Sequence, residues 1–381
     1  AVTKNTYDAL GRKTSETAVS DAQPAGATST YTYDKMSRLV SATEPLVTNV
    51  VTLAKHQQKT VTSFDLDGNV LRTEVSDTQG GDPTRVMTFE LDDHGRPARA
   101  TNAEGAETSY SYDRLGNKTS MVDANGNHFD YTYTARNLTA EVRLRDWEDD
   151  GGDNDYTVVQ SFAYDMGGRV ARNTDPMGRS VVYEYYGDDL VKSITLKDFH
   201  NPDGTKRDVL VESNTYDGAG HVLTEKARNG ALLTQYTYDA VGRTQSEVVD
   251  PNGAARRTTY TYDLAGNVLG TASSGMPSNV PWPVSTAAEK VSFAYDDDGN
   301  LQNETVENGS DPRTTSYVYD QRGLAKSKTD PMGNTTEFAY DALGRPISTT
   351  APAVRTESNG SAPTTSRPVT YTGYDTFGAV T

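Results

Sequence analysis

Aspartate is the residue type in this 381-residue chain whose number and regular spacing could support chemistry. Eleven of the 23 tyrosines are followed directly by Asp, and ten of those eleven have Gly four residues after the Tyr. Paired carboxylates can act as a general acid and base, but copies spread along a whole chain do not form one active site. Asp is also favoured at the first position of a type I turn, with Gly in the left-handed position that closes a bulged hairpin. The sequence therefore predicts that these aspartates build turns.

The densest group of carboxylates lies at residues 146–155. Asp146, Glu148 and Asp150 occupy the first, third and fifth positions of a calcium-binding loop pattern. The last position, where a bidentate Glu belongs, is Thr157. These three acidic residues are therefore a weak calcium candidate, and an exposed insertion at a hairpin tip is the favoured interpretation.

Other residue types offer no constellation for catalysis. The five histidines, at positions 56, 94, 128, 200 and 221, contain no pair at metal-ligand spacing, and the chain has no cysteine. The sequence also lacks a Gly-x-Ser-x-Gly nucleophile motif and a phosphate-binding loop. We therefore expect no catalytic residue, no cofactor and no enzyme activity within this chain.

The elements that position the aspartates are predicted to be strands. Tyr-x-Tyr alternation places both rings on one face of a strand, the turn follows, and Arg or Asn then opens a second alternating strand. The residues that carry this repeat signature are Tyr33, Asp34, Tyr112, Asp113, Gly116, Tyr164, Asp165, Gly168, Tyr238, Asp239, Gly242, Tyr262, Asp263, Gly266, Tyr319, Asp320, Gly323, Tyr340, Asp341 and Gly344.

A second turn of similar composition ends each second strand. Pro presets the backbone angle of the second turn position and cannot lie within a central strand. The residues assigned to these second turns are Asp175, Pro176, Gly178, Asp250, Pro251, Gly253, Asp330, Pro331 and Gly333. Each repeat is therefore expected to be one β-hairpin.

Repetition decides the fold class. About fifteen units with a mean spacing of about 26 residues follow one another, with degenerate units at Thr134 and Tyr186. We predict an all-β fold in which tandem β-hairpin repeats form one long antiparallel sheet that curls or spirals, because very wide sheets do not stay flat. Residues 1–381 are expected to form one continuous array, with exposed loop insertions near 146–155, 271–290 and 351–368.

Composition limits the core and the partners. Only 34% of the residues are hydrophobic, and Tyr outnumbers Phe by 23 to 8, which indicates a thin sheet wetted by solvent. The net charge of −17 disfavours nucleic acid and anionic membranes as partners. No apolar run reaches the roughly 18 residues that a membrane span requires.

The consensus Tyr-x-Tyr-Asp-x-x-Gly-Arg followed by Asp-Pro-x-Gly resembles the RHS or YD-repeat family over essentially the whole chain. That family includes bacterial RHS toxins, shell-forming components of insecticidal toxin complexes, wall-associated bacterial proteins and the animal teneurins. The resemblance implies that the repeats form part of a hollow β-shell, which in the toxins encloses a C-terminal effector segment. In that family a conserved region closes such shells and includes a self-cleaving aspartyl protease site, and this region has no recognisable counterpart here. Because both ends of the chain fall within a repeat, we expect an internal stretch of a longer protein.

Two functions remain open from the sequence. The first is a non-catalytic stretch of shell wall that encapsulates or displays a C-terminal effector or toxin segment of the same polypeptide. The alternative is a secreted or cell-surface bacterial scaffold that binds glycans or mediates adhesion. The tyrosine rings distinguish the two, because they either stack on one another across strands, which is the favoured interpretation, or stack on sugars. Expected partners are other parts of the longer chain and possible cell-surface glycans, with no nucleic acid and no membrane span.

Overall fold

A computed structural model describes residues 2–145, 156–275, 289–307, 311–356 and 364–381. Within these ranges the chain forms β-strands joined by turns and loops, and contains no helix. The prediction of an all-β fold made of tandem hairpins is confirmed. The described residues therefore include no helix that could cross a membrane.

The chain divides into two compact units. The first comprises Ala1–Glu107 together with Phe293–Thr381, and the second comprises Thr108–Ser292. In the second unit the strands are β11 (Glu107–Tyr112), β12 (Lys118–Val122), β13 (His128–Tyr133), β14 (Thr139–Arg145), β15 (Tyr156–Tyr164), β16 (Val170–Thr174), β17 (Ser180–Tyr185), β18 (Val191–His200), β19 (Lys206–Tyr216), β20 (Val222–Ala227), β21 (Leu232–Tyr238), β22 (Thr244–Val249), β23 (Arg256–Tyr262), β24 (Val268–Ser274) and the start of β25 (Glu289–Tyr295).

The first unit is built from both ends of the chain. Its N-terminal strands are β1 (Val2–Tyr7), β2 (Lys13–Val19), β3 (Ala27–Tyr33), β4 (Leu39–Thr43), β5 (Val47–Thr48), β6 (Lys55–His56), β7 (Gln58–Phe64), β8 (Val70–Asp77), β9 (Arg85–Leu91) and β10 (Pro97–Thr101). Its C-terminal strands are β26 (Leu301–Glu307), β27 (Arg313–Tyr319), β28 (Ala325–Thr329), β29 (Thr335–Tyr340), β30 (Pro346–Thr350), β31 (Val354–Thr356), β32 (Thr364–Ser366) and β33 (Val369–Tyr371).

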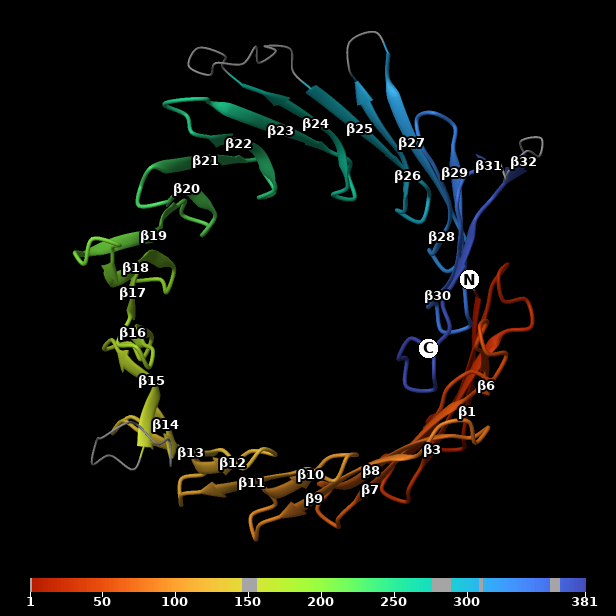
Figure 1. Cartoon of the computed structure of the whole chain (residues 1–381), viewed down its shortest axis with the longest axis horizontal. Coiled ribbons are helices and arrows are strands. Elements are labelled where there is room, and N and C mark those ends of the chain that lie inside the picture. Colours follow the sequence, from red (N-terminus) through yellow and green to blue (C-terminus); the bar gives the residue numbers. More distant parts are fainter. Residues whose placement is uncertain (1, 146–155, 276–288, 308–310, 357–363) are drawn as a thin grey trace. The chain divides into compact units, whose positions relative to one another are not determined.

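Neighbours in sequence are neighbours in the sheet. From β11 to β25 each strand of the second unit pairs antiparallel with the next, so this unit is a continuous chain of hairpins (Figure 1). The N-terminal part of the first unit follows the same order, except that the small β5–β6 hairpin is inserted between β4 and β7. The C-terminal part runs from β26 to β30 and then to β33, with β31 and β32 paired separately.

The sheet has almost no dry core. Among the described residues, Val47 and Val248 are the buried hydrophobic side chains, and no large side chain is completely buried. Several strands that precede a first turn alternate instead: in β3, Tyr31 and Tyr33 are half-buried whereas Thr32 is exposed. Polar and aromatic contacts must therefore stabilise the array where a thicker protein would use a hydrophobic core.

Two of the predicted insertions are partly strand. Residues 271–274 complete β24 and residues 289 and 290 begin β25, and β31 and β32 form a short hairpin within 351–368. Pro, Ser and Thr in these segments suggested loops, but Thr and Ser are compatible with the polar face of a wetted strand. Residues 146–155 lie outside the described part of the chain.

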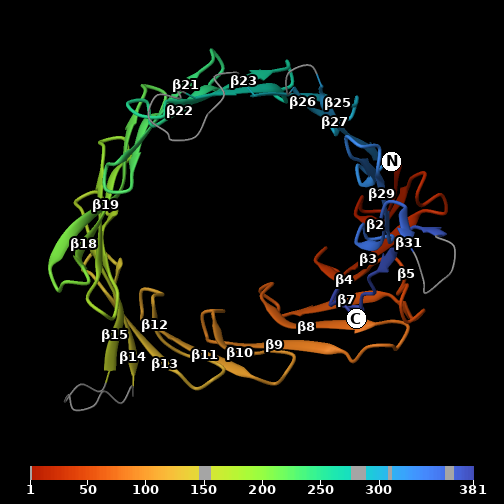
Figure 2. The ribbon, with the colours of Figure 1, turned by 45° about the horizontal axis from the view of Figure 1, so that its top comes forward.

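The two parts of the first unit touch at the end of the chain. The side-chain amide of Asn49 donates to the carbonyl of Tyr374 (3.0 Å) and to Oγ1 of Thr381 (2.8 Å). The backbone N–H of Thr376 donates to Oδ2 of Asp82 (2.8 Å). We call these contacts between residues 49–82 and 373–381 the seam; Figure 2 shows the C-terminal end of the chain next to β4 and β7, the strands on either side of residue 49.

Candidate functional site

The aspartate of each first turn organises the hairpin through both of its carboxylate oxygens. At Asp34, Oδ1 accepts hydrogen bonds from the backbone N–H of Met36 and of Arg38, each at 2.9 Å. Oδ2 accepts from Nε of Arg38 at 2.7 Å. The same pattern recurs at the turns that begin with Asp8, Asp92, Asp239 and Asp341. These are the contacts of a carboxylate that caps a turn, and no second carboxylate accompanies these aspartates in the contacts described.

Glycine closes each of these turns in the left-handed conformation. Gly242 has φ +85°, and its N–H donates to the carbonyl of Asp239 at 3.1 Å. The register of the two strands shifts next to the preceding tyrosine, between Thr237 and Tyr238. This is the bulge that a type I turn followed by a left-handed residue produces.

The arginine that follows the glycine joins one repeat to the next. In addition to its bond to Asp239, Arg243 donates from Nη1 to the carbonyl of Asp263 in the following repeat (2.9 Å). Equivalent bonds to the next first turn are made by Arg12, Arg38, Arg136, Arg169, Arg322 and Arg345. These contacts form a ladder along the edge of the sheet that carries the first turns, which the sequence analysis did not predict.

The second tyrosine of each Tyr-x-Tyr pair completes the ladder. The hydroxyl of Tyr262 donates to the carbonyl of Thr244 on the preceding strand (2.7 Å), and Arg243 lies over its ring, 4.5 Å from the centroid. The hydroxyl makes the corresponding bond at Tyr33, Tyr133, Tyr164, Tyr185, Tyr216, Tyr238, Tyr319, Tyr340 and Tyr374. We refer to these arginine and tyrosine contacts together as the turn ladder.

The contacts of the tyrosine rings differ from those expected, which were mainly rings stacked on one another. Tyrosine pairs are few among the described contacts: Tyr186 meets Tyr216 edge-on and Tyr317 stacks on Tyr319. Arginines cover the ring faces of Tyr33, Tyr185, Tyr262 and Tyr374 instead. The physical reason is that a guanidinium held at the turn lies directly above the ring of the next repeat, where cation–π attraction adds to its hydrogen bonds.

The remaining signature residues occupy corresponding positions with different partners. Asn replaces Arg at Asn117 and Asn267, where its amide donates to Oδ2 of Asp113 and Asp263. At Asp320 the guanidinium comes from Arg322, two residues on, because Leu324 stands where repeats such as that of Asp239 have Arg. Gly116, Gly168, Gly266, Gly323 and Gly344 all have positive φ values, as do Gly178 and Gly333 of the second turns.

The second turns at Asp175 and Asp330 repeat the first-turn geometry, but the turn at Asp250 does not. Asp250 itself has φ +52°, and Gly253 does not adopt a positive φ. The connection between β22 and β23 spans residues 250–255, one residue more than the connections at 175–179 and 330–334. Asp250 therefore accepts from Ala255 N (2.7 Å) as well as from Gly253 N.

The degenerate repeat at Tyr186 leaves a hollow in the ladder. Here Leu190 replaces the arginine, and a pocket of about 400 Å³ is lined by Tyr186, Asp188, Tyr216 and Asp217 together with neighbouring turn residues. The Tyr186 hydroxyl donates to the carbonyl of Asn214 at 3.1 Å. This is the place in the second unit where two tyrosines and two aspartates border one cavity.

The turn aspartates are held in their charged form. The Arg96 side chain and backbone N–H groups lower the pKa of Asp92 to about 2. The backbone N–H of Arg38 and its guanidinium likewise lower the pKa of Asp34. Hydrogen bonds to a carboxylate favour ionisation, so these lowered pKa values follow from the contacts that each aspartate makes within its turn.

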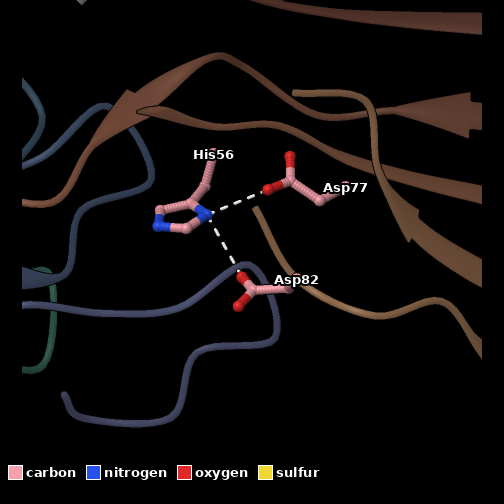
Figure 3. Close-up of side chains that lie close together, drawn as sticks. All are labelled: His56, Asp77 and Asp82. Atoms are coloured by element: carbon pink, nitrogen blue, oxygen red, sulfur yellow. Dashed lines mark hydrogen bonds and ion pairs between the residues drawn. The ribbon is translucent and has the colours of Figure 1, made fainter. Parts of the chain in front are cut away.

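The calcium candidate Asp146, Glu148 and Asp150 lies outside the described residues. Within the described ranges, one group of three potential metal-binding side chains comes together: His56, Asp77 and Asp82 (Figure 3). The search for histidine pairs missed it, because it contains a single histidine and two aspartates 21 and 26 residues further on. Its only signal in the sequence is the irregular Asp77-Thr-Gln-Gly-Gly-Asp82 turn.

Comparison with known proteins gives a match to one family model and to two curated relatives. Residues 92–128, 216–255 and 319–356 match the model of the RHS Repeat family. The chain is 32% identical over 146 residues to the double-stranded DNA deaminase toxin A of Burkholderia cenocepacia, which is 35% of this chain and 9% of the relative. It is 26% identical over 280 residues to the tRNA3(Ser)-specific nuclease WapA of Bacillus spizizenii, which is 64% of this chain and 12% of that relative. The chain therefore spans only a small part of the length of either relative.

One solved structure has a similar fold along the whole chain. The crystal structure of TcdB2-TccC3-TEV aligns with 100% of this chain and 23% of its own, with a TM-score of 0.56 and 15% sequence identity. At that identity the similarity concerns the fold alone.

Proposed function

Because this chain is an array of RHS repeats, we propose that it is a stretch of wall in a hollow β-shell that encloses a C-terminal effector segment of its own polypeptide. In this proposal the chain is a structural segment without catalytic residues, and its partners are neighbouring shell repeats and the enclosed segment. The parent protein is secreted or displayed at the bacterial cell surface.

The turn ladder is the observation that supports this proposal most. Main-chain pairing alone would allow a wide sheet to slip or bend at any hairpin, since each hairpin contacts only its neighbours. The Arg243 bond to the Asp263 carbonyl and the Tyr262 bond to the Thr244 carbonyl tie consecutive repeats at a fixed spacing. Such coupling suits a wall that must keep its curvature around a cargo.

The named relatives fit the same proposal. One is named as a DNA deaminase toxin and the other as a tRNA nuclease, two different chemistries, and this chain matches 9% and 12% of their lengths. A shared repeat segment combined with different activities is expected if the repeats form a container and another segment carries the chemistry. We accordingly place the effector of the parent protein outside this chain.

Glycan binding is the second candidate function, and it has one local observation in its favour. Arginines cover several of the repeated tyrosine rings, which leaves those faces unavailable to sugars. The Tyr186 pocket retains two aromatic rings and two carboxylates at its border. Loss of polysaccharide binding on Tyr216→Ala substitution would support this candidate for that pocket.

Limited proteolysis of the full-length parent protein tests encapsulation. We expect its C-terminal segment to resist a protease that digests the same segment when it is expressed alone. Arg243→Ala together with Arg169→Ala, which removes two bonds of the turn ladder, should make the segment cleavable. Arg179→Ala is the matched control, because Arg179 pairs only with Asp175 of its own turn in the described contacts. Equal cleavage of the segment in the unmodified parent and in isolation would contradict the proposal.

A further inference from the structure

Three oxygen atoms converge on one nitrogen at the seam. Nδ1 of His56 lies 3.0 Å from Oδ2 of Asp77, 3.1 Å from Oδ2 of Asp82 and 3.0 Å from Oγ1 of Thr376. His56 comes from β6, Asp77 ends β8, Asp82 lies in the turn before β9, and Thr376 belongs to the last turn of the chain. The two carboxylates point at the same edge of the imidazole ring (Figure 3).

The available protons cannot give each of these close contacts a well-aligned hydrogen bond. The imidazole has at most one proton on Nδ1, and that proton points in one direction in the ring plane. It cannot align well with two carboxylate oxygens and a hydroxyl at once. The Thr376 hydroxyl supplies one further proton. The carboxylate oxygens of Asp77 and Asp82 nevertheless lie close to the same point beside His56 Nδ1.

The group is also withdrawn from water. The side chain of His56 is 7% exposed, that of Asp77 is 0% exposed and that of Asp82 is 21% exposed. Two carboxylates in such a place require a nearby positive charge, because an unpaired buried charge is strongly destabilising. Among the described residues the ion-pair partner of both carboxylates is His56, which supplies a positive charge only when it is protonated, and neither lysine nor arginine pairs with Asp77 or Asp82.

Surrounding backbone groups hold the carboxylates in position. Asp77 accepts from the N–H groups of Gln57, Gln79 and Gly81, each at 3.0 Å. A Cβ on Gly81 would lie 3.0 Å from Asp77 Oδ2 and 3.3 Å from His56 Nδ1, so a larger residue there would press on both side chains. Asp82 accepts from the N–H of Thr376 at 2.8 Å. Oriented carboxylates backed by N–H donors are typical of metal sites.

We propose that His56 Nδ1, Asp77 Oδ2, Asp82 Oδ2 and Thr376 Oγ1 bind one divalent transition-metal ion, which clasps the end of the chain to the β5–β6 hairpin. Ligands about 2.1 Å from an ion lie about 3.4 Å apart in a tetrahedral site and about 3.0 Å apart at right angles. The separations of 3.0 to 3.1 Å from Nδ1 match ligands at right angles, as in five- or six-fold coordination. Imidazole nitrogen combined with carboxylate oxygen favours Zn²⁺ or a similar ion over Ca²⁺ and Mg²⁺, which prefer oxygen ligands alone.

The ion would join residues that are distant in sequence. Thr376 lies 320 residues after His56, and the seam also contains the Asn49 bonds. Just beyond the seam, the Arg85 guanidinium lies 3.9 Å from the ring centroid of Phe377. A metal that binds this arrangement and not the separated segments stabilises the seam by mass action. The inference does not depend on the proposed shell function.

Zn²⁺ titration of the metal-stripped full chain by calorimetry tests the clasp. We expect one Zn²⁺ to bind per chain. Bound Zn²⁺ should raise the temperature at which the seam unfolds, and amide hydrogen exchange at residues 374–381 follows that unfolding. Asp82→Asn keeps the size of the side chain and should weaken Zn²⁺ binding by more than about 100-fold, beyond the effect expected for an outer partner. Co²⁺ should give a visible absorption spectrum with the unmodified chain that Asp82→Asn loses.

Two controls separate this site from adventitious binding. His94→Gln removes an exposed histidine and should leave Zn²⁺ affinity unchanged. Replacing Asp146, Glu148 and Asp150 by their amides should also leave it unchanged. The proposal is overturned if the unmodified chain binds no Zn²⁺ at millimolar concentration, or if Asp82→Asn binds Zn²⁺ and protects residues 374–381 as the unmodified chain does.

Discussion

At the scale of single residues, the second tyrosine of each repeat does the work that buried aliphatic side chains do in thicker folds. Tyr262 is anchored at its hydroxyl by the Thr244 carbonyl, and its ring lies under Arg243. Each contact is local and modest in energy, but the chain repeats it along both units. Stability in such an array accumulates from neighbour to neighbour.

Removal of one hydroxyl tests the anchoring bond. Tyr262→Phe keeps the ring and leaves the Thr244 carbonyl without its donor, which should cost about 0.5–1.5 kcal/mol of local stability. Hydrogen exchange of the amides in β22 to β24 measures this loss. Tyr7→Phe is the control, because Tyr7 is 60% exposed and makes no comparable bond in the described contacts. Equal effects of the two substitutions would show that the hydroxyl bond contributes nothing.

Substitution of two turn glycines by alanine distinguishes the cost of backbone strain from the cost of steric crowding. Gly266 has φ +97° with open space where a Cβ would project, so Gly266→Ala should cost about 1–2 kcal/mol from the left-handed conformation alone. Gly242 has φ +85°, and a Cβ there would lie 2.9 Å from Nε2 of His221. Gly242→Ala should therefore lower the thermal-unfolding midpoint further than Gly266→Ala. The reverse order would contradict the packing of His221 against this turn.

At the scale of the hairpin, the carboxylate of the turn makes stability depend on acid pH. The folded pKa of Asp92, about 2, lies below its ordinary value of 3.8, so folding favours the ionised form. This contribution is complete above the ordinary pKa and is lost as the pH falls through about 2. The thermal-unfolding midpoint should therefore fall between about pH 4 and pH 2, since other turn aspartates are lowered in the same direction.

Asp92→Asn should make this acid dependence shallower. Asp67→Asn, at an exposed turn position, serves as the control and should leave the slope as it is in the unmodified chain. A midpoint that stays constant from pH 5 to pH 2 would show that the turn carboxylates do not stabilise the folded chain through their charge.

The link between hairpins can be weakened without removing a charge. Arg243 bonds simultaneously to Asp239 and to the carbonyl of Asp263, and the single ammonium of lysine cannot reproduce this fork. Arg243→Lys should reduce the hydrogen-exchange protection of the turn at 263–267 by about 1 kcal/mol. Arg179→Lys changes an arginine that pairs within its own turn and should leave the neighbouring turn unaffected. Similar losses in both variants would mean that the ladder does not couple repeats.

Hairpins could be predicted from the sequence because their determinants are local. Five consecutive residues, such as Tyr238 to Gly242, define the bulge, the turn and the carboxylate that caps it. The Arg243 contact to the next repeat was not predicted, because it depends on how far the following hairpin is displaced. The different turn at Asp250 was also missed, since one additional residue in the connection changes which residue adopts the left-handed conformation.

At the scale of the whole molecule, the contacts of the seam could not be predicted from the sequence. Asn49 and Thr381, or His56 and Thr376, are more than 300 residues apart, and no periodic pattern relates them. Their contacts arise within the first unit, which both ends of the chain build together. The repeats account for the sheet, whereas irregular residues between repeats account for this tertiary contact.

The container role requires that the repeats act together in the longer protein. The turn ladder supplies coupling between neighbours, and the chain aligns along its whole length with part of a solved structure of the same fold. Under the proposed container role, effector chemistry belongs to a segment outside this chain.

A cryo-EM reconstruction of the full-length parent protein is the most direct test of that role. The account predicts a closed shell in which residues 1–381 form part of the wall, with density for the C-terminal segment inside. An open or extended array with an empty interior and an exposed C-terminal segment would contradict it.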